Sequence, residues 1–142
     1  MNESFVTFRV VYEDLPDMIE LAIDLRHGGW SALAGIYVSP ALLANDAAQL
    51  IEWSRNPIEP LRFGSGINPG SGGFVMQFRT VDAAQHVRCL FQLATRELNG
   101  DPAWQVVLEI PTELGLVERF GQECVALGQT LRGESRLTGL PT

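Results

Sequence analysis

One stretch decides the fold of this chain: Ile19-Glu-Leu-Ala-Ile-Asp-Leu-Arg-His27-Gly28-Gly29-Trp30-Ser-Ala-Leu-Ala-Gly-Ile-Tyr-Val38. On both sides of the two glycines, apolar residues occupy every second position, which is the period of a half-buried strand. A two-residue Gly-Gly loop is typical of the tight turn of a β-hairpin. The sequence therefore predicts an antiparallel hairpin over residues 19–38.

The turn also sets the register of this hairpin. If the residues on either side of the two glycines pair with each other, four apolar residues of the first strand face four of the second. These pairs are Leu25–Ala32, Ile23–Ala34, Leu21–Ile36 and Ile19–Val38. A slip of one residue would set apolar side chains against polar ones, because successive side chains point to opposite faces. We therefore expect Ile23 to face Ala34.

Similar patterns predict the other strands. Residues 5–12 are β-branched or aromatic almost throughout, which favours a strand. Alternation of apolar and polar residues predicts three more strands over 74–79, 87–94 and 104–110, and a short strand is expected over 60–67.

Two helices complete the expected order of elements. Ser39-Pro40 is typical of a helix start, and the residue before Pro57 is typical of its end. Pro111-Thr112 predicts the start of a second helix, with Glu113 in its first turn. The order β-β-β-α-β-β-β-β-α predicts an α+β fold in which an antiparallel meander sheet packs with two helices.

The chain length of 142 residues fits one domain. We expect a single α+β domain over residues 1–131. Residues 132–142 contain Gly, Ser and Pro without hydrophobic periodicity, which is typical of a flexible tail.

The charges exclude several classes of function. The formal net charge is −7, and all ten basic residues are arginine, so lysine-dependent chemistry is excluded. An acidic chain is a poor partner for nucleic acid or an anionic membrane, both of which require a positive surface. The first residues do not have the pattern of a secretory signal, and two cysteines are too few for a disulfide framework. We expect a cytoplasmic protein.

No catalytic, cofactor-binding or metal-binding constellation is recognisable. The segment 64–73 is rich in glycine but matches neither phosphate-binding motif, and we interpret it as a flexible hairpin connection. His27 closes the hairpin beside Trp30, where packing of the two rings is the simplest interpretation. His86 and Cys89 have an odd spacing that places them on opposite faces of a strand. We expect no catalytic residue, no cofactor and no metal, and hence no enzyme.

Two features suggest a protein partner. The first is an acidic cluster without an intervening basic residue; its members are Glu13, Asp14, Asp17, Glu20 and Asp24. Such a cluster would attract a basic partner, although a solvated surface is the commoner explanation. The second is an apolar spot around Leu90, with Val75 and Val107, on the outer faces of the last three predicted strands. A homodimer is a further alternative.

The pattern of the whole chain resembles a known group of proteins. It combines the Arg26-His-Gly-Gly-Trp30 hairpin, the Ser39-Pro40 helix start, Gly72-Gly73-Phe74 before a strand, and Trp104-Gln-Val-Val-Leu-Glu-Ile-Pro111 before a helix. Over about residues 5–128 this resembles small bacterial proteins related to the WapI-like immunity proteins of polymorphic toxin systems. The resemblance implies a cytoplasmic, non-catalytic protein that binds and blocks a toxin domain. Two other classes stay open: a small-ligand-binding domain, and an enzyme whose site is not recognised.

Overall fold

The computed structural model describes residues 3–14, 17–68, 72–95 and 102–141. Ten helices and strands follow one another within these residues. They are β1 (Ser4–Asp14), β2 (Met18–His27), β3 (Trp30–Val38), α1 (Pro40–Arg55), β4 (Leu61–Asn68), β5 (Gly72–Thr80), β6 (His86–Ala94), β7 (Gln105–Glu113), α2 (Leu114–Thr130) and β8 (Glu134–Thr138).

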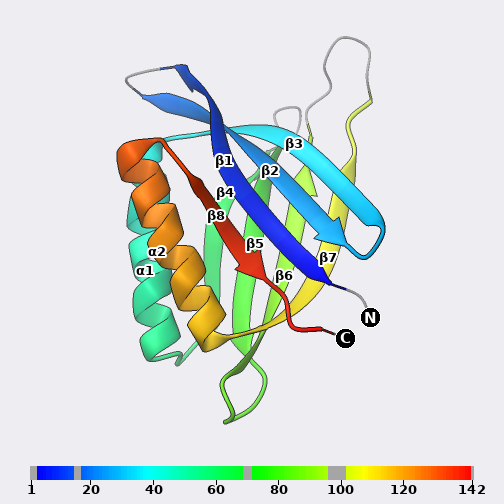
Figure 1. The fold of residues 1–142 in the computed structure, drawn as a ribbon, viewed down its shortest axis with the longest axis vertical. Coiled ribbons are helices and arrows are strands. Elements are labelled where there is room, and N and C mark those ends of the chain that lie inside the picture. The colour runs from blue at the N-terminus through cyan, green and yellow to red at the C-terminus, as the bar shows by residue number, and fades with distance from the viewer. Residues whose placement is uncertain (1–2, 15–16, 69–71, 96–101, 142) are drawn as a thin grey trace.

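The strands form two antiparallel four-stranded sheets. Sheet A has the order β3-β2-β1-β8, and sheet B has the order β4-β5-β6-β7. The two sheets face each other, and α1 and α2 lie side by side along one flank, next to the edge strands β8 and β4 (Figure 1). The α+β class and the expected succession of strands and helices are confirmed, with the meander divided between two sheets.

The predicted hairpin has the expected register. Ile23 pairs with Ala34, and all the other pairs on both faces follow from the pairing of His27 with Trp30. The turn is made possible by Gly28, whose φ of 60° lies in the left-handed region. On the inner face, Ile19, Leu21, Ile23 and Leu25 are all fully buried. The hydrophobic pattern and the glycine turn therefore agree, and together they fix this half of sheet A.

One hydrophobic core lies between the sheets and the helices. Phenylalanines form its centre: the Phe8 ring lies 5.0 Å from that of Phe74 in the opposite sheet and 5.4 Å from that of Phe120 in α2. Phe63 of β4 contacts both Phe74 and Phe120. Rings from both sheets and a helix thus meet edge to face, an arrangement that aromatic pairs prefer.

The two helices approach each other closely because α2 has glycines on its inner side. A Cβ atom added at Gly121 would lie 2.8 Å from Cγ1 of Ile51, and one added at Gly128 would lie 2.6 Å from the carbonyl oxygen of Pro40. The start of α1 is fixed as expected, because the Ser39 side chain accepts a hydrogen bond from the Leu42 amide.

The predicted start of the second helix is wrong. Pro111, Thr112 and Glu113 belong to β7, and α2 begins at Leu114. Proline has no backbone N–H to donate to a neighbouring strand. Pro111 is tolerated because β7 is an edge strand, where such a donor is not required on the open side. The Thr112 side chain is fully buried and its hydroxyl donates a hydrogen bond to the Thr138 carbonyl. These tertiary contacts outweigh the local preference of the sequence for a helix start.

The prediction of a flexible tail over residues 132–142 is also wrong for its central part. Residues Glu134–Thr138 form β8, which pairs with β1 (Figure 1). Ser135 and Leu137 are fully buried, and the Ser135 hydroxyl hydrogen-bonds to the Phe120 carbonyl of α2. The alternation of buried and exposed residues in β8 covers only five residues, which is too short to stand out in the sequence.

Candidate functional site

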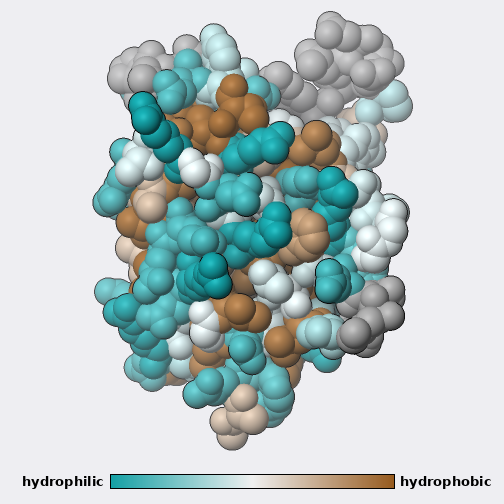
Figure 2. Space-filling model, in the orientation of Figure 1, coloured by the Kyte–Doolittle hydropathy of each residue, from teal (hydrophilic) through white to brown (hydrophobic). Residues whose placement is uncertain are grey.

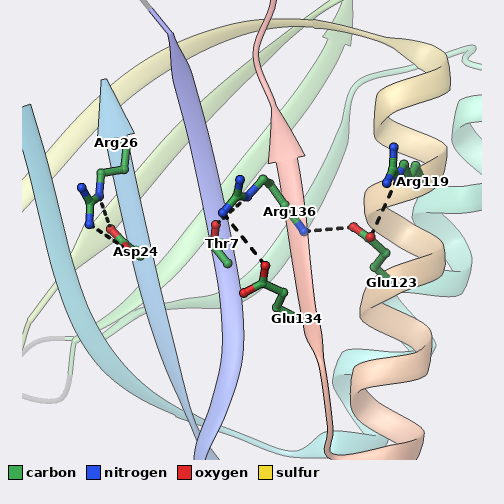
Figure 3. Close-up of polar contacts among 7 residues, drawn as sticks. All are labelled: Thr7, Asp24, Arg26, Arg119, Glu123, Glu134 and Arg136. Atoms are coloured by element: carbon green, nitrogen blue, oxygen red, sulfur yellow. Dashed lines mark hydrogen bonds and ion pairs between the residues drawn. The ribbon is translucent and has the colours of Figure 1, made fainter. Parts of the chain in front are cut away.

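The members of the predicted acidic cluster have different surroundings. Asp24 is on the outer face of β2, where both of its carboxylate oxygens accept hydrogen bonds from Arg26, at 3.0 and 3.3 Å (Figure 3). This ion pair neutralises the Asp24 charge. The other four members, Glu13, Asp14, Asp17 and Glu20, lie at or near the ends of β1 and β2 that are joined by residues 15–16.

The middle of the outer face of sheet A is a mixed network rather than an acidic surface. Arg136 of β8 donates a hydrogen bond to the Thr7 hydroxyl and lies 4.0 Å from Glu134, and its backbone amide donates to Glu123 of α2 (Figure 3). Its guanidinium also lies over the Phe5 ring. Hydrophilic residues cover this region in the space-filling view (Figure 2). The network joins β8 to β1 and α2, and its charges largely compensate one another.

Two exposed tyrosines and the half-buried Glu20 form a row across the end of sheet A. Glu20 of β2 pairs with Tyr12 of β1 on one side and with Tyr37 of β3 on the other. The two tyrosines are 56% and 37% exposed. Tyrosines are enriched at protein–protein interfaces, because they bury a large area and lose little conformational freedom. This row, Tyr12–Glu20–Tyr37, contains one member of the predicted cluster, Glu20, and adds two tyrosines that the sequence did not single out.

A β-bulge creates this row. The register of β1 against β2 shifts between Val10 and Tyr12, so Val11 is an extra residue. Without the shift, Val11 would face Glu20 and Tyr12 would point to the inner side. Bulges commonly redirect a side chain beside a functional site. The sequence of β1 gives no sign of this shift, so the outward position of Tyr12 could not be predicted from it.

The row continues into a pocket at the beginning of α1. Tyr37 forms part of the pocket wall, and the pocket has a volume of about 290 Å³. Phe63 and Phe74, both buried, contribute apolar walls from sheet B, and Met18 and Leu42 line it from sheet A and α1. The lining is thus mostly apolar.

Asp46 of α1 is the carboxylate of this pocket. Partial burial raises the pKa of the Asp46 carboxyl above its usual value. In the described parts of the chain, no residue donates a hydrogen bond to Asp46 or forms an ion pair with it. Partial burial takes away some of the interactions of the carboxylate with water. A positively charged group in the pocket would replace those interactions. Asp46 follows the buried Leu43 by three positions, and this spacing alone did not distinguish it from other polar residues of the helix.

Leu90 lies on the outer face of sheet B, in a second hollow. Its neighbours across the strands are Gln77 of β5 and Glu109 of β7. Of its expected apolar companions, Val107 is 54% exposed, whereas Val75 is buried. The predicted apolar spot is therefore smaller than expected, and charged side chains line much of the hollow.

The two cysteines are buried free thiols in the core. Desolvation raises the pKa of Cys89 far above its usual value and that of Cys124 to about 12. The Cys124 sulfur also lies 3.0 Å from the Ser135 hydroxyl oxygen. Thiols that stay protonated and inaccessible are poor nucleophiles.

His27 has a partner that the sequence did not suggest. Its Nδ1 lies 2.6 Å from the hydroxyl oxygen of Ser4, 23 positions away, because β1 and β2 pair there. Ser4 is only 3% exposed, so a substrate could not reach its hydroxyl. The second histidine, His86, contacts Asp82 in the exposed turn before β6, and this contact lowers the pKa of the Asp82 carboxyl.

The glycine-rich segment is mostly strand rather than loop. Residues up to Asn68 belong to β4 and those from Gly72 belong to β5; residues 69–71 lie outside the described part. A Cβ at Gly73 would collide with the Gly66 carbonyl oxygen, so glycine permits this close strand pairing.

Within the described residues, no three side chains of His, Cys, Asp or Glu come together as metal ligands would, and none of the helices has the length and hydrophobicity needed to cross a membrane. No protein-family model matches the chain, and neither a curated protein nor a solved structure matches it.

Proposed function

We propose that this protein is a non-catalytic binding module that captures a basic segment of another protein. The observation that carries this proposal is the continuity of the Tyr12–Glu20–Tyr37 row with the Asp46 pocket, since Tyr37 belongs to both. The resemblance to immunity proteins of toxin systems suggests that the partner is a toxin domain, and a cytoplasmic location follows from that resemblance.

The pocket suits an arginine or lysine side chain of the partner. Both have an apolar stem, which would contact Met18 and Leu42, and a cationic end, which would meet Asp46. An anchor residue in a desolvated pocket, surrounded by weaker contacts, is the usual distribution of energy in protein interfaces. The tyrosines and Glu20 would supply those surrounding contacts.

The net charge of −7 supports the same partner. Attraction between opposite charges raises the rate of association, and salt weakens it as the Debye length falls to about 3 Å at 1 M. Because Asp24 is paired with Arg26, the attraction is expected to centre on Glu20 and Asp46.

The test compares two double variants as immobilised baits in a lysate of the organism that encodes the protein. Glu20→Gln with Asp46→Asn removes two charges at the proposed site. Glu52→Gln with Glu59→Gln removes two exposed charges at and beyond the other end of α1. A partner held by the wild type and by the second variant, but lost from the first, supports the proposal. Equal retention by both variants contradicts it.

A small organic cation is the second candidate ligand, because a pocket of about 290 Å³ is near the lower end of the range for small molecules. Replacing Tyr12, which does not line the pocket, distinguishes the two. Tyr12→Ala should weaken binding of a protein partner and leave a small cation unaffected.

A further inference from the structure

The outer face of sheet B carries a positive charge that the rest of this acidic protein does not lead one to expect. Arg79 of β5 and Arg88 of β6 are direct cross-strand partners. Like charges in this position destabilise a sheet. Arg62 of β4 lies on the same face, in the row Arg62–Gln77–Leu90–Glu109 that crosses all four strands.

Glu109 is the carboxylate that compensates this pair. Its two oxygens lie 3.7 Å from Arg79 and 3.7 Å from Arg88, respectively. These distances exceed the 2.7–2.9 Å or so of direct charge-assisted hydrogen bonds. Three guanidinium groups and one carboxylate leave a local charge of +2, although the whole chain carries −7.

The guanidinium groups of Arg62, Arg79 and Arg88 have N–H donors that no described residue accepts. Arg62 forms no ion pair with another described residue, and no described residue accepts a hydrogen bond from Arg62, Arg79 or Arg88. Each guanidinium has five N–H donors in a planar fork that matches the oxygens of carboxylates and phosphates. Unused donors of this kind favour an oxyanion.

The same face is hollowed. A pocket of about 360 Å³ is lined by Arg62, Arg79 and Glu109 together with the apolar side chains of Leu61 and Leu90. Pro60 and Leu61 form a wall at the edge strand, and Leu90 forms part of the lining between the charged groups. The hollow therefore offers charge for an anionic group and an apolar surface for the remainder of a small molecule.

We propose that this hollow binds a small dianion, with its carboxylate or phosphoryl oxygens held by Arg62 and Arg79 and its apolar part on Leu90. Glu109 lies beside Arg79 and Arg88 and competes with the ligand for them. The lining of this hollow shares no residue with the Asp46 pocket or the Tyr12–Glu20–Tyr37 row, so each proposal can be tested without the other.

The test is an NMR titration of the ¹⁵N-labelled protein with inorganic phosphate and, separately, with succinate, at constant ionic strength against chloride. We expect saturable shifts of the Arg62 and Arg79 Nε–H signals and of the amides around Leu90. The tighter of the two probes identifies the oxyanion. Shifts that do not saturate, or that lie elsewhere, overturn the proposal.

Variants sharpen the test. Arg62→Gln and Arg79→Gln should each weaken binding about tenfold, the size expected for one charge-assisted interaction. The matched control is Arg9→Gln, which removes the same charge from an exposed arginine on the outer face of sheet A and should change affinity less than about twofold. Equal weakening by Arg9→Gln and Arg79→Gln overturns the proposal, because it would reflect net charge alone.

Replacing the Glu109 carboxylate should change the affinity for phosphate in the opposite direction. Glu109→Gln should tighten phosphate binding several-fold, because it removes the anion that competes for Arg79 and Arg88. Glu134→Gln, an equivalent change on sheet A, should not. Retained amide dispersion in each spectrum shows that the variant is folded. An unchanged affinity in Glu109→Gln contradicts the assigned site.

Discussion

Gly128 and Gly115 lie near opposite ends of α2 and have opposite surroundings. A Cβ at Gly115 would meet nothing within 4 Å, whereas a Cβ at Gly128 would lie 2.6 Å from the Pro40 carbonyl oxygen and 3.1 Å from the Cβ of Ala44. The obstructing oxygen is a backbone atom of α1, so it cannot rotate away. Replacing each glycine with alanine therefore tests how closely the two helices need to approach.

The expected magnitude follows from two opposing effects. Alanine is favoured over glycine inside a helix by up to about 1 kcal/mol, and this gain is similar at the two positions. At position 128, ordinary contact begins at 3.4 Å, so α1 has to move by about 0.8 Å; overpacking of this kind costs about 1–3 kcal/mol. Gly115→Ala should be neutral to stabilising, and Gly128→Ala should be less stable than Gly115→Ala by about 1–3 kcal/mol.

The assay is chemical unfolding followed by circular dichroism, with thermal unfolding as a second measurement. For a chain of this length, the difference corresponds to roughly 3–10 °C in Tm. Comparing the two variants with each other cancels the helix propensity and leaves the contact with α1. If Gly128→Ala is as stable as Gly115→Ala, the close approach of the helices at Pro40 does not exist as described.

Three further predictions concern the thiols, β8 and the acidic residues. Burial raises the pKa of Cys124 to about 12, so the stabilising contribution of this thiol is complete below the unfolded pKa of about 8.5 and is lost as pH rises towards 12; the free energy of unfolding in denaturant should fall by roughly 1–2 kcal/mol between pH 8.5 and 10 because of this thiol, and Cys124→Ala should lack that component. Deleting residues 134–142 should lower the free energy of unfolding by several kcal/mol, because the fully buried Leu137 and the partner strand of β1 are removed. Deleting only residues 141–142 should leave it unchanged. An unchanged Tm for the longer deletion would refute this prediction. Replacing the whole ion pair (Asp24→Asn with Arg26→Gln) leaves the net charge unchanged and should leave the rate of association with a basic partner unchanged, whereas Glu20→Gln should lower that rate at low salt; equal effects in stopped-flow measurements would mean that the Asp24–Arg26 pair does not neutralise Asp24.

The sequence predicts local structure well where periodicity and turn chemistry act together. The hairpin around Gly28 is the clearest case, since both its pairing and its buried face follow from residues 19–38. Predictions failed where tertiary contacts dominate: Pro111 remains in an edge strand because β6 and the C-terminal residues bind it, and β8 is a strand because β1 offers it a partner. Neither influence is visible in the local sequence.

In the candidate surfaces too, the sequence identifies residue types, whereas the tertiary structure decides which residues come together. The acidic residues were identified from sequence, but the pairing of Asp24 with Arg26 and the bulge that turns Tyr12 outward depend on strand geometry. Asp46 was missed because it is one polar residue among several in α1, and only the approach of β4 and β5 forms a pocket around it. Leu90 was placed on the correct face, whereas the convergence of three arginines there requires the register of all four strands of sheet B.

The pairing of β8 with β1 has a consequence for how the chain is made. Synthesis proceeds from the N-terminus, so β1 leaves the ribosome well before β8, which follows all the other helices and strands described. Throughout that interval, the outer edge of β1 has unpaired amides and carbonyls beside the apolar residues Val6 and Phe8. Open edges of this kind invite pairing with other chains. We therefore expect ribosome-bound nascent chains ending before residue 134 to remain open to aggregation or to chaperones, and the emergence of β8 to be the event that completes sheet A.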